Sequence, residues 1–381
     1  MAFRLSSEQQ EFRELLRRFF AEQLPSGELR RQMQSESGFD PELWKRICSE
    51  LGLAGLGLPE AQGGSGFGFA ELCLALREAG AVLLGAPLFG SAALAGRALL
   101  HAASEPARAR LLPELAAGEV FALAFVGERG DWDPREAGCE ARERRGRFAL
   151  SGAQQIVLHG HTAERILVVA REPGGAADAR VGLYLVEGSA PGLTREALRG
   201  LDLTRRCARL RFESSPAERL DAGGDTAAAL ARALDEARIA LANEMLGGLE
   251  RVLETAVAYA RSRRQFGRAI GSFQAIKHKC ADLLIATEAS RSACQVAAEA
   301  VDDADPELPL LAAIAKAQLS QAYSHAAQEN VQIHGGVGFT WEYDAHLYQR
   351  RAKASEIFLG DARWNREAAL QWLAARAAAS A

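Results

Sequence analysis

Three arginines stand directly before an aromatic residue and a glycine in the second half of the chain. They are Arg261, Arg263 and Arg264, followed by Phe266-Gly267 and then by Gln274, between two long helical patterns. Such guanidinium groups can hold a pyrophosphate, because the planar fork of Arg bonds phosphate oxygens bidentately. An aromatic ring beside them can stack on a flat ligand. The alternative is a basic helix end, since cations near a helix C-terminus offset the macrodipole.

A second segment with possible chemistry is Gln332-Ile-His-Gly-Gly-Val-Gly338. Gln332 offers both a donor and an acceptor, and Gly335 and Gly336 allow another group to approach the backbone closely. The alternative is a turn that ends a helix, with His334 as a packed or capping side chain. The Gly-rich stretch 63–68 has no strand before it and no Gly-Lys-Ser/Thr, so it predicts a flexible turn rather than a phosphate loop.

These segments resemble the acyl-CoA dehydrogenase family. The run YARSRRQFGRAIGSFQAIKH, from Tyr259, looks like the flavin-contacting segment of that family. Gln332–Glu342 and Leu58–Gly66 are similar to two further family segments, in the family's order and at roughly its spacing. The likeness covers nearly the whole chain, strongly at its two ends and poorly in the middle.

The resemblance implies FAD as cofactor and α,β-dehydrogenation of an acyl-CoA as the reaction, with electrons passed to an external acceptor. It places the protein in lipid metabolism. In the family, the adenosine-diphosphate half of FAD is bound across a subunit interface, so a homotetramer or a heterotetramer with a related chain is expected. Carried over by motif position, the cofactor-binding residues are Arg263, Phe266, Gln274, Gln332, Gly335 and Gly336.

The general base departs from the family pattern. Such enzymes remove the proton α to the thioester carbonyl, so a carboxylate must lie at the α carbon. Most members carry it in an Ile-Tyr-Glu-Gly-Thr segment, which reads here Ile357-Phe-Leu-Gly-Asp361. Leu359 therefore stands at the Glu position and cannot take a proton, while Asp361 stands where the family contacts flavin phosphate. A minority places the base just before an Arg on an earlier helix, and that position is Ala237 here.

Glu244 is the candidate base that remains. It follows Ala237 by two helical turns, so it shares that helix face about 10 Å further along. It lies in the otherwise apolar run 241–246, where burial would raise the proton affinity of a carboxylate. The alternative is that Glu244 is structural and pairs with an Arg or Lys of a neighbouring helix.

The flavin-ring end of the site also departs from the family. Members contact the ring through a Thr-Glu-Pro and a Trp-Ile-Thr segment, and the matching places read Phe121–Val126 and Gln155–His159. Ala124, Ile156 and Leu158 stand where the family has Thr, Trp and Thr. The adenine end therefore matches the family and the ring end does not. His159 and His161 either line a remodelled pocket or, as we favour, lie in a surface turn.

Three functions are compatible with these residues. The favoured one is a FAD-dependent acyl-CoA dehydrogenase with an unusual base. The second is a non-catalytic partner subunit that completes the FAD site of a related chain, similar to subunits of bacterial steroid side-chain degradation enzymes; the residues at 124, 156, 158 and 359 motivate it. The third is a flavin oxidase or monooxygenase on the same fold, although no residue positively indicates oxygen chemistry.

Composition excludes several other classes. The chain has 381 residues, of which 48% are hydrophobic and 25% charged, and its net charge is −4. That charge argues against nucleic-acid binding, which favours basic proteins. The six cysteines form no C-x-x-C pair and no metal-ligand spacing, which predicts a reduced cytoplasmic protein without a metal site. No window reaches the roughly 18 consecutive apolar residues of a membrane span, and no signal-peptide pattern opens the chain.

The hydrophobic periodicity predicts a mainly α protein with a β insert. We expect an N-terminal helical domain over residues 1–118, a middle β-barrel or β-sandwich domain over 119–222 and a C-terminal four-helix bundle over 223–381. Capping signals set the first helix starts, at Ser7 with Gln10 and at Asp40-Pro41. The expected helices of the third domain span 226–262, 272–302, 308–334, 341–353 and 360–378.

Overall fold

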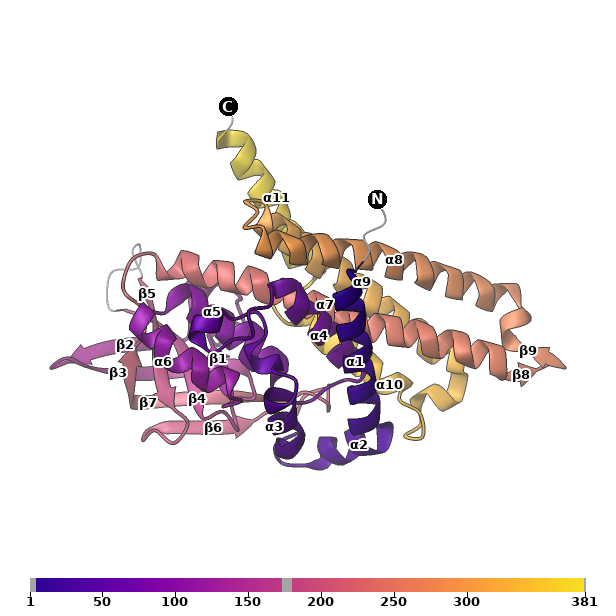
Figure 1. Ribbon diagram of the computed structural model, residues 1–381, viewed down its shortest axis with the longest axis horizontal. Coiled ribbons are helices and arrows are strands. Elements are labelled where there is room, and N and C mark those ends of the chain that lie inside the picture. Colours follow the sequence, from indigo (N-terminus) through magenta and orange to yellow (C-terminus); the bar gives the residue numbers. More distant parts are fainter. Residues whose placement is uncertain (1–4, 173–179, 380–381) are drawn as a thin grey trace.

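The protein folds as helices, then strands, then helices, as the sequence predicted. The computed structural model describes residues 5–172 and 180–379 (Figure 1). Its N-terminal part is helical, with η3 (Phe89–Ala95) running directly into α5. The helices of this part are α1 (Ser7–Gln23), α2 (Ser26–Gln34), α3 (Pro41–Ser49), α4 (Phe69–Ala81), α5 (Gly96–Ala102) and α6 (Glu105–Ala116).

The helix starts follow local capping chemistry. Asp40 caps α3 by accepting a hydrogen bond from the Glu42 N–H, with Pro41 at the first helical position, as predicted. The prediction for α1 was wrong by one residue, because the capping box is formed by Ser6 and Gln9. Two overlapping Ser-x-x-Gln patterns fit this segment equally well. A tertiary hydrogen bond from Gln9 Nε2 to Glu71 Oε1, 2.9 Å long, favours the earlier pair.

The middle part is a β structure whose strand pairings close on themselves. Strand β4 pairs with both β2 and β5, and the chain of pairings β2–β3–β7–β5 completes the ring, with β1 and β6 attached at its sides. The strands are β1 (Phe121–Ala124), β2 (Cys139–Arg144), β3 (Arg147–Leu158), β4 (Arg165–Arg171), β5 (Val181–Glu187), β6 (Leu193–Ala197) and β7 (Cys207–Arg219). Charged β2 and β7 lacked a clear strand signal in the sequence, because only their inward residues are buried.

The third part is a bundle built around α9. This helix packs against α7, α8, α10 and α11, and α7 also packs against α4 of the first part. The helices are α7 (Thr226–Ser262), α8 (Gln274–Asp302), α9 (Leu308–His334), α10 (Ala345–Ile357) and α11 (Ala362–Ala379). A short hairpin of β8 (Arg264–Gln265) and β9 (Arg268–Ala269) joins α7 to α8.

Two glycines let α4 and α7 cross at close range. A Cβ atom on Gly80 would lie 1.9 Å from the Glu244 carbonyl oxygen, and one on Gly247 would lie 1.7 Å from the Arg77 carbonyl oxygen. Both distances are far below van der Waals contact, so neither site accepts a side chain. This crossing fixes the helix that carries Glu244 against the N-terminal domain.

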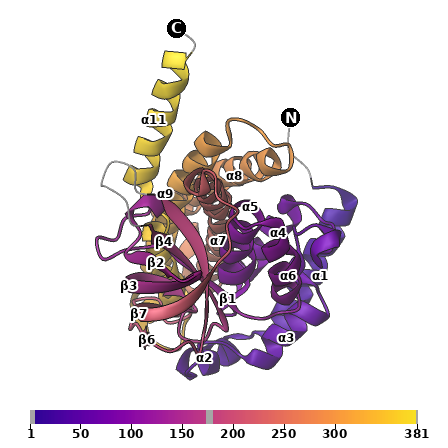
Figure 2. The ribbon, with the colours of Figure 1, turned by 90° about the vertical axis from the view of Figure 1, so that its left-hand side faces the viewer.

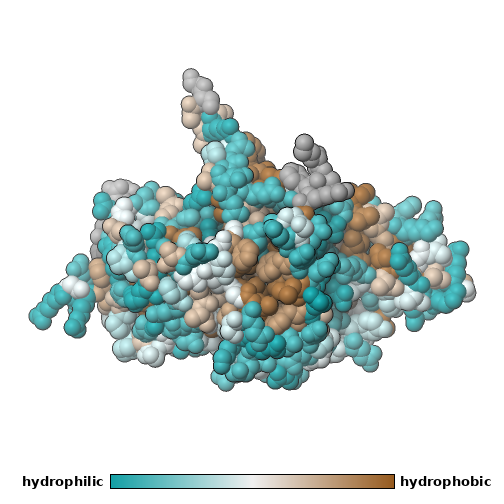
Figure 3. All heavy atoms as spheres, viewed as in Figure 1, coloured by the Kyte–Doolittle hydropathy of each residue, from teal (hydrophilic) through white to brown (hydrophobic). Residues whose placement is uncertain are grey.

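The hydropathy of the outer surface differs between parts of the molecule. In the view of Figure 3 most of the surface is hydrophilic, and hydrophobic residues gather in the middle of this face. Helix α11 leaves the body and projects outward in both Figure 1 and Figure 2, with only Asn365 buried along its length. None of the helices in the described ranges is long and apolar enough to cross a membrane.

Candidate functional site

The two motifs predicted to bind the adenine half of the cofactor meet at one end of the molecule. The ring of Tyr259 on α7 stacks on His334 at the end of α9, with centroids 4.1 Å apart. Beside them, Ala256, Ala260 and Ile333 form a small core of their own. The structure therefore brings the Arg263–Gln274 segment beside the Gln332–Gly336 segment, although some 60 residues separate them. His334 is a packed side chain, the alternative that the sequence favoured.

The cofactor candidates at this end all face solvent. Phe266 and Gly267 have φ of 53° and 77° and form the tip of the β8–β9 hairpin, where Phe266 is 88% exposed. A two-residue turn with both φ positive matches the twist of a hairpin, and it holds this aromatic ring away from the body. Arg263, Gln274 and Gln332 are also exposed. A Cβ on Gly335 or Gly336 would meet no atom within 4 Å, so the backbone there is open to a ligand.

This end lies far from the chain's own β structure. The β8–β9 hairpin and the strands β2 and β3 occupy opposite ends of the long axis in Figure 1. Arg263 and Gln332 therefore lie at the opposite end of the molecule from this chain's own β structure.

The segment at the usual base position is buried and tightly held. Leu359 is fully buried with φ of 61°, and its carbonyl accepts a hydrogen bond from Arg238 Nε at 3.2 Å. Lys316 Nζ donates to the carbonyls of Glu356 and Gly360, at 3.0 and 2.9 Å. Burial lowers the pKa of Lys316 to about 7. Asp361 caps α11 by accepting from the Trp364 N–H at 2.8 Å. The loop therefore presents backbone and apolar groups where a base would stand.

Glu244 lies in a buried ionic network. Its carboxylate accepts from Arg351 Nη1 on α10 at 3.1 Å and also pairs with Arg205, which precedes β7. Arg351 itself bonds Asp202 at 2.6 Å. These contacts match the alternative in which Glu244 pairs with an Arg of a neighbouring helix. No sequence pattern indicated the network, because its members come from distant segments.

A cavity of about 410 Å³ lies where the resemblance places the flavin ring. Ile156 and Leu158 line it from β3, and Ile357 and Phe358 line it from the end of α10. Trp132, which the sequence analysis did not single out, closes one side, with its ring centroid 5.1 Å from that of Phe358. The walls are therefore largely apolar, and Leu158 supplies no hydroxyl to them.

A β-bulge accompanies Ile156 at this cavity wall. The register of β3 against β7 shifts between Gln154 and Val157, and Ile156 has φ of 54°. A β-branched residue rarely adopts positive φ, so the surrounding sheet must hold this conformation at some cost. The strained residue therefore lies at the wall of the apolar cavity between the β structure and α10.

His159 and His161 do not lie in a surface turn, so that expectation was wrong. His159 is 3% exposed and packs edge-on against Phe39, and burial lowers its pKa to about 3. His161 is half-buried, and its Nε2 lies 3.2 Å from the Ser37 carbonyl oxygen. Residues of the N-terminal domain cover this turn, which local sequence could not reveal.

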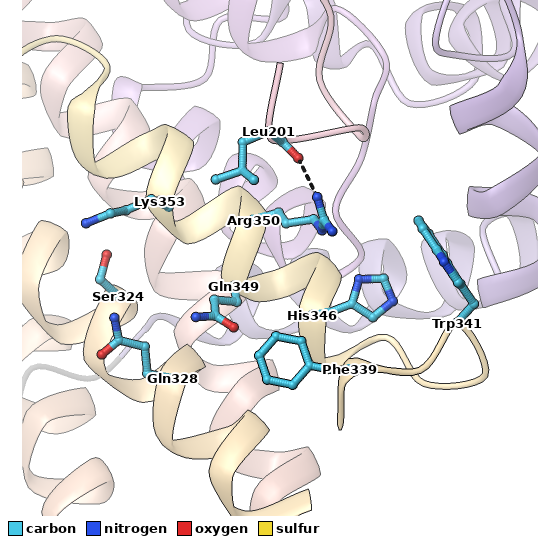
Figure 4. Close-up of a pocket in the computed structure, with 9 residues that line it drawn as sticks. All are labelled: Leu201, Ser324, Gln328, Phe339, Trp341, His346, Gln349, Arg350 and Lys353. Atoms are coloured by element: carbon cyan, nitrogen blue, oxygen red, sulfur yellow. Dashed lines mark hydrogen bonds between the residues drawn. The ribbon is translucent and has the colours of Figure 1, made fainter. Parts of the chain in front are cut away.

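A polar recess of about 280 Å³ adjoins the apolar cavity, because both are lined by Leu201 and Lys353. Figure 4 shows Gln328 of α9 and Gln349 of α10 facing this recess, with Arg350 reaching the Leu201 carbonyl at 3.4 Å. His346 is 4% exposed, and among the described residues neither of its ring nitrogens has a hydrogen-bond partner. Phe339 and Trp341 form the exposed rim.

Known proteins share both the sequence and the fold of this chain. The family models for the N-terminal and C-terminal domains of acyl-CoA dehydrogenase match residues 6–119 and 226–374. The chain is 35% identical to the acyl-CoA dehydrogenase IpdE2 of Mycobacterium tuberculosis, over 92% of this chain and 93% of that protein.

Solved structures agree with this relationship. A variant of the Tcur3481-Tcur3483 steroid ACAD superposes with a TM-score of 0.87 at 31% identity, over 97% of this chain and 99% of that one. The ChsE4-ChsE5 complex of Mycobacterium tuberculosis gives a TM-score of 0.87 at 28% identity, over 98% and 99%. The protein is therefore a member of the acyl-CoA dehydrogenase family of oxidoreductases.

Proposed function

We propose that this chain takes part in FAD-dependent α,β-dehydrogenation of an acyl-CoA, as the subunit that supplies the adenine-diphosphate half-site to the flavin of a neighbouring chain. The observation that carries the proposal is the contrast between two ends of one molecule. The exposed Arg263 and Gln332 end keeps the cofactor-binding residue types. The chain's own ring cavity and base position have lost theirs.

The residues at the exposed end fit the outer half of FAD. Arg263 presents guanidinium donors suited to pyrophosphate oxygens, and the Gln332 amide can both donate and accept. Gly335 and Gly336 leave the backbone open, and Phe266 presents a ring for stacking. Gln274 stands at the start of α8, where free backbone N–H groups favour an anion. FAD, when bound, supplies the hydride acceptor for oxidation at the β carbon.

The chain's own ring site lacks the groups that the reaction needs. Leu359 cannot accept the α proton, and Asp361 is engaged as a helix cap. The polar edge of a flavin ring against Leu158 would leave donors and acceptors unpaired, at about 1–3 kcal/mol each. Glu244 is held by two arginines, which supports a structural role over that of a base.

The proposed partners follow from the same geometry. The similar ChsE4-ChsE5 structure is a complex of two components, which supports a heterotetramer with a related chain here. Exposed apolar side chains on α8 and α11, among them Ile285 and Leu370, supply further surface for assembly. An acyl-CoA substrate, an external electron acceptor and a cytoplasmic location belong to the same proposal.

Flavin stoichiometry tests the proposal directly. We expect the purified chain to be colourless and to take up no added FAD. Co-expressed with a related acyl-CoA dehydrogenase chain, it should yield an assembly with about one FAD per two chains that oxidises an acyl-CoA. One FAD per chain in the isolated protein, with dye reduction by acyl-CoAs that Glu244→Gln abolishes, would instead establish a self-sufficient enzyme with Glu244 as base.

A further inference from the structure

The apolar cavity and the polar recess beside it together form an amphipathic hollow. The cavity measures about 410 Å³ and the recess about 280 Å³, and they share Leu201 and Lys353. Small-molecule sites are typically clefts of about 300–1,000 Å³ with apolar walls and a few polar groups. The pair therefore has the size and lining of a ligand site rather than of a packing defect.

The inner walls favour an apolar body. Trp132 and Phe358 contribute aromatic surface, and Ile156, Leu158 and Ile357 contribute aliphatic surface. The charged groups at the back are already satisfied within the protein, because Arg205 pairs with Glu244 and Asp202 pairs with Arg351. A ligand group entering this end would meet hydrocarbon and aromatic carbon, because the charged side chains of this end are paired with each other.

The outer end favours a negative charge. Arg199 lines the cavity as an exposed residue, and in the described part of the chain it has neither an ion pair nor a hydrogen bond. Lys353 stands between cavity and recess with its side chain half exposed, beside its i+3 partner Glu356. Arg350 adds a third cation in the recess, where it bonds the Leu201 carbonyl at 3.4 Å.

The buried His346 adds an unused polar group to the recess. Neither of its ring nitrogens is hydrogen-bonded within residues 5–172 and 180–379, although the residue is only 4% exposed. Burial and the neighbouring Arg350 and Arg30 lower the pKa of His346, so the ring is neutral at physiological pH and can donate one hydrogen bond. A buried polar group without a partner is rare in folded proteins, and a bound ligand or its water would satisfy it.

From this arrangement we propose that the hollow binds an amphiphilic organic anion, with its apolar body in the cavity and its anionic group between Arg199, Lys353 and the recess. This ligand is distinct from the flavin that the proposed function assigns to a neighbouring chain. The site occupies the space that the family resemblance assigns to the chain's own flavin ring. In this chain the walls of that space are largely hydrocarbon.

Calorimetric titration with matched probes tests this proposal on the purified full chain. Decanoate supplies an anion on an alkyl body, decanol supplies the same body without charge, and lumiflavin supplies an isolated flavin ring. We expect saturable decanoate binding that is several-fold tighter than decanol binding, and no lumiflavin binding. High salt should remove most of the difference between decanoate and decanol, because exposed charges are screened.

Variants locate the binding. Arg199→Gln should weaken decanoate about two- to fivefold and leave decanol unchanged, the size expected for an exposed charge pair. Ala354→Trp should fill the cavity and weaken both alkyl probes at least tenfold, and Ile357→Trp, at a 55% exposed position, repeats this test with less risk to folding. The matched controls are Arg147→Gln and Ala374→Trp, both at exposed positions elsewhere.

Three results would overturn the proposal. They are an absence of decanoate binding up to about 1 mM, decanoate binding that both tryptophan variants leave intact, and displacement of decanoate by lumiflavin. Uptake of intact FAD by the isolated chain would instead refute the proposed function. The proposed function and the anion site are therefore refuted by different measurements, FAD uptake and decanoate binding.

Discussion

Glu244 and Arg263 are both charged side chains at α7, and the fold gives them opposite surroundings. Glu244 is 6% exposed, and both of its carboxylate oxygens are occupied by arginines. Arg263 ends the helix in solvent with its guanidinium free among the described residues. A guanidinium without such a partner can bind a ligand, whereas the Glu244 carboxylate already has two cationic partners.

Replacing Arg263 tests the half-site. In the assembly with its related chain, Arg263→Gln should weaken FAD binding about 10- to 100-fold, because a hydrogen bond to a charged group contributes about 1.5–3 kcal/mol. Fluorescence titration of the apo-assembly with FAD measures this change. Arg147→Gln, which removes an exposed cation from the β structure, should leave the affinity unchanged. Equal effects of the two variants would mean that only overall charge matters.

Replacing Glu244 separates its two possible roles. Glu244→Gln should lower the free energy of unfolding by about 3 kcal/mol, because it leaves Arg351 and Arg205 without their carboxylate. Urea denaturation gives the value. Glu254→Gln, on the exposed side of the same helix, should cost under about 0.5 kcal/mol. An unchanged urea midpoint for Glu244→Gln, combined with loss of acyl-CoA oxidation, would mean that Glu244 is the general base.

At the scale of elements, the α10–α11 loop depends on a lysine from another helix. Lys316 on α9 is fully buried and bonds the Ser320 hydroxyl, the Glu356 carbonyl at the end of α10 and the Gly360 carbonyl in the loop. These bonds satisfy carbonyls at the end of α10 that have no partner within the helix. Together with the bond from Arg238 of α7 to the Leu359 carbonyl, they fix this loop through side chains that lie outside it.

The buried lysine predicts a specific dependence of stability on pH. Its pKa is about 7 in the folded chain and near 10.5 when exposed. Between these values the unfolded state binds more protons, so the contribution of Lys316 to stability should rise with pH, by at most about 1.4 kcal/mol per unit. Urea denaturation from pH 7 to 9.5 should show a steeper rise for the wild type than for Lys316→Met. Parallel curves would mean that Lys316 titrates normally.

At the scale of the whole molecule, Arg351 joins all three parts of the fold. From α10 it bonds Asp202 and Thr204 of the β structure, Glu244 of α7 and the carbonyls of Leu83 and Leu84 after α4. It is 2% exposed. One guanidinium thus satisfies acceptors from three domains, which makes this residue a shared contact between them.

Removing this guanidinium should uncouple the domains. Arg351→Met should lower the free energy of unfolding by about 3–5 kcal/mol, because it leaves two buried carboxylates with fewer partners. Differential scanning calorimetry should also resolve more than one transition, since the domains would lose a shared contact. Arg350→Met, the adjacent residue on the same helix, should keep the wild-type profile. A single unshifted transition for Arg351→Met would contradict the assigned role.

Some features of this protein follow from local sequence patterns, and others follow only from tertiary contacts. The sequence by itself determined the fold class, the long helices of the C-terminal part and the family, because helical periodicity and short motifs are local properties. It also located Arg263, Phe266 and Gln332, whose residue types follow a contiguous pattern.

Only the tertiary structure revealed the arginine partners of Glu244, the burial of His159 and the amphipathic hollow. Each depends on side chains that are distant in the sequence, such as Arg351 against Glu244, Phe39 against His159, and Trp132 against Phe358. Burial and pairing are properties of the space between elements. No spacing along a single helix or strand encodes them, because the partner that satisfies or covers a group is chosen only when the elements pack.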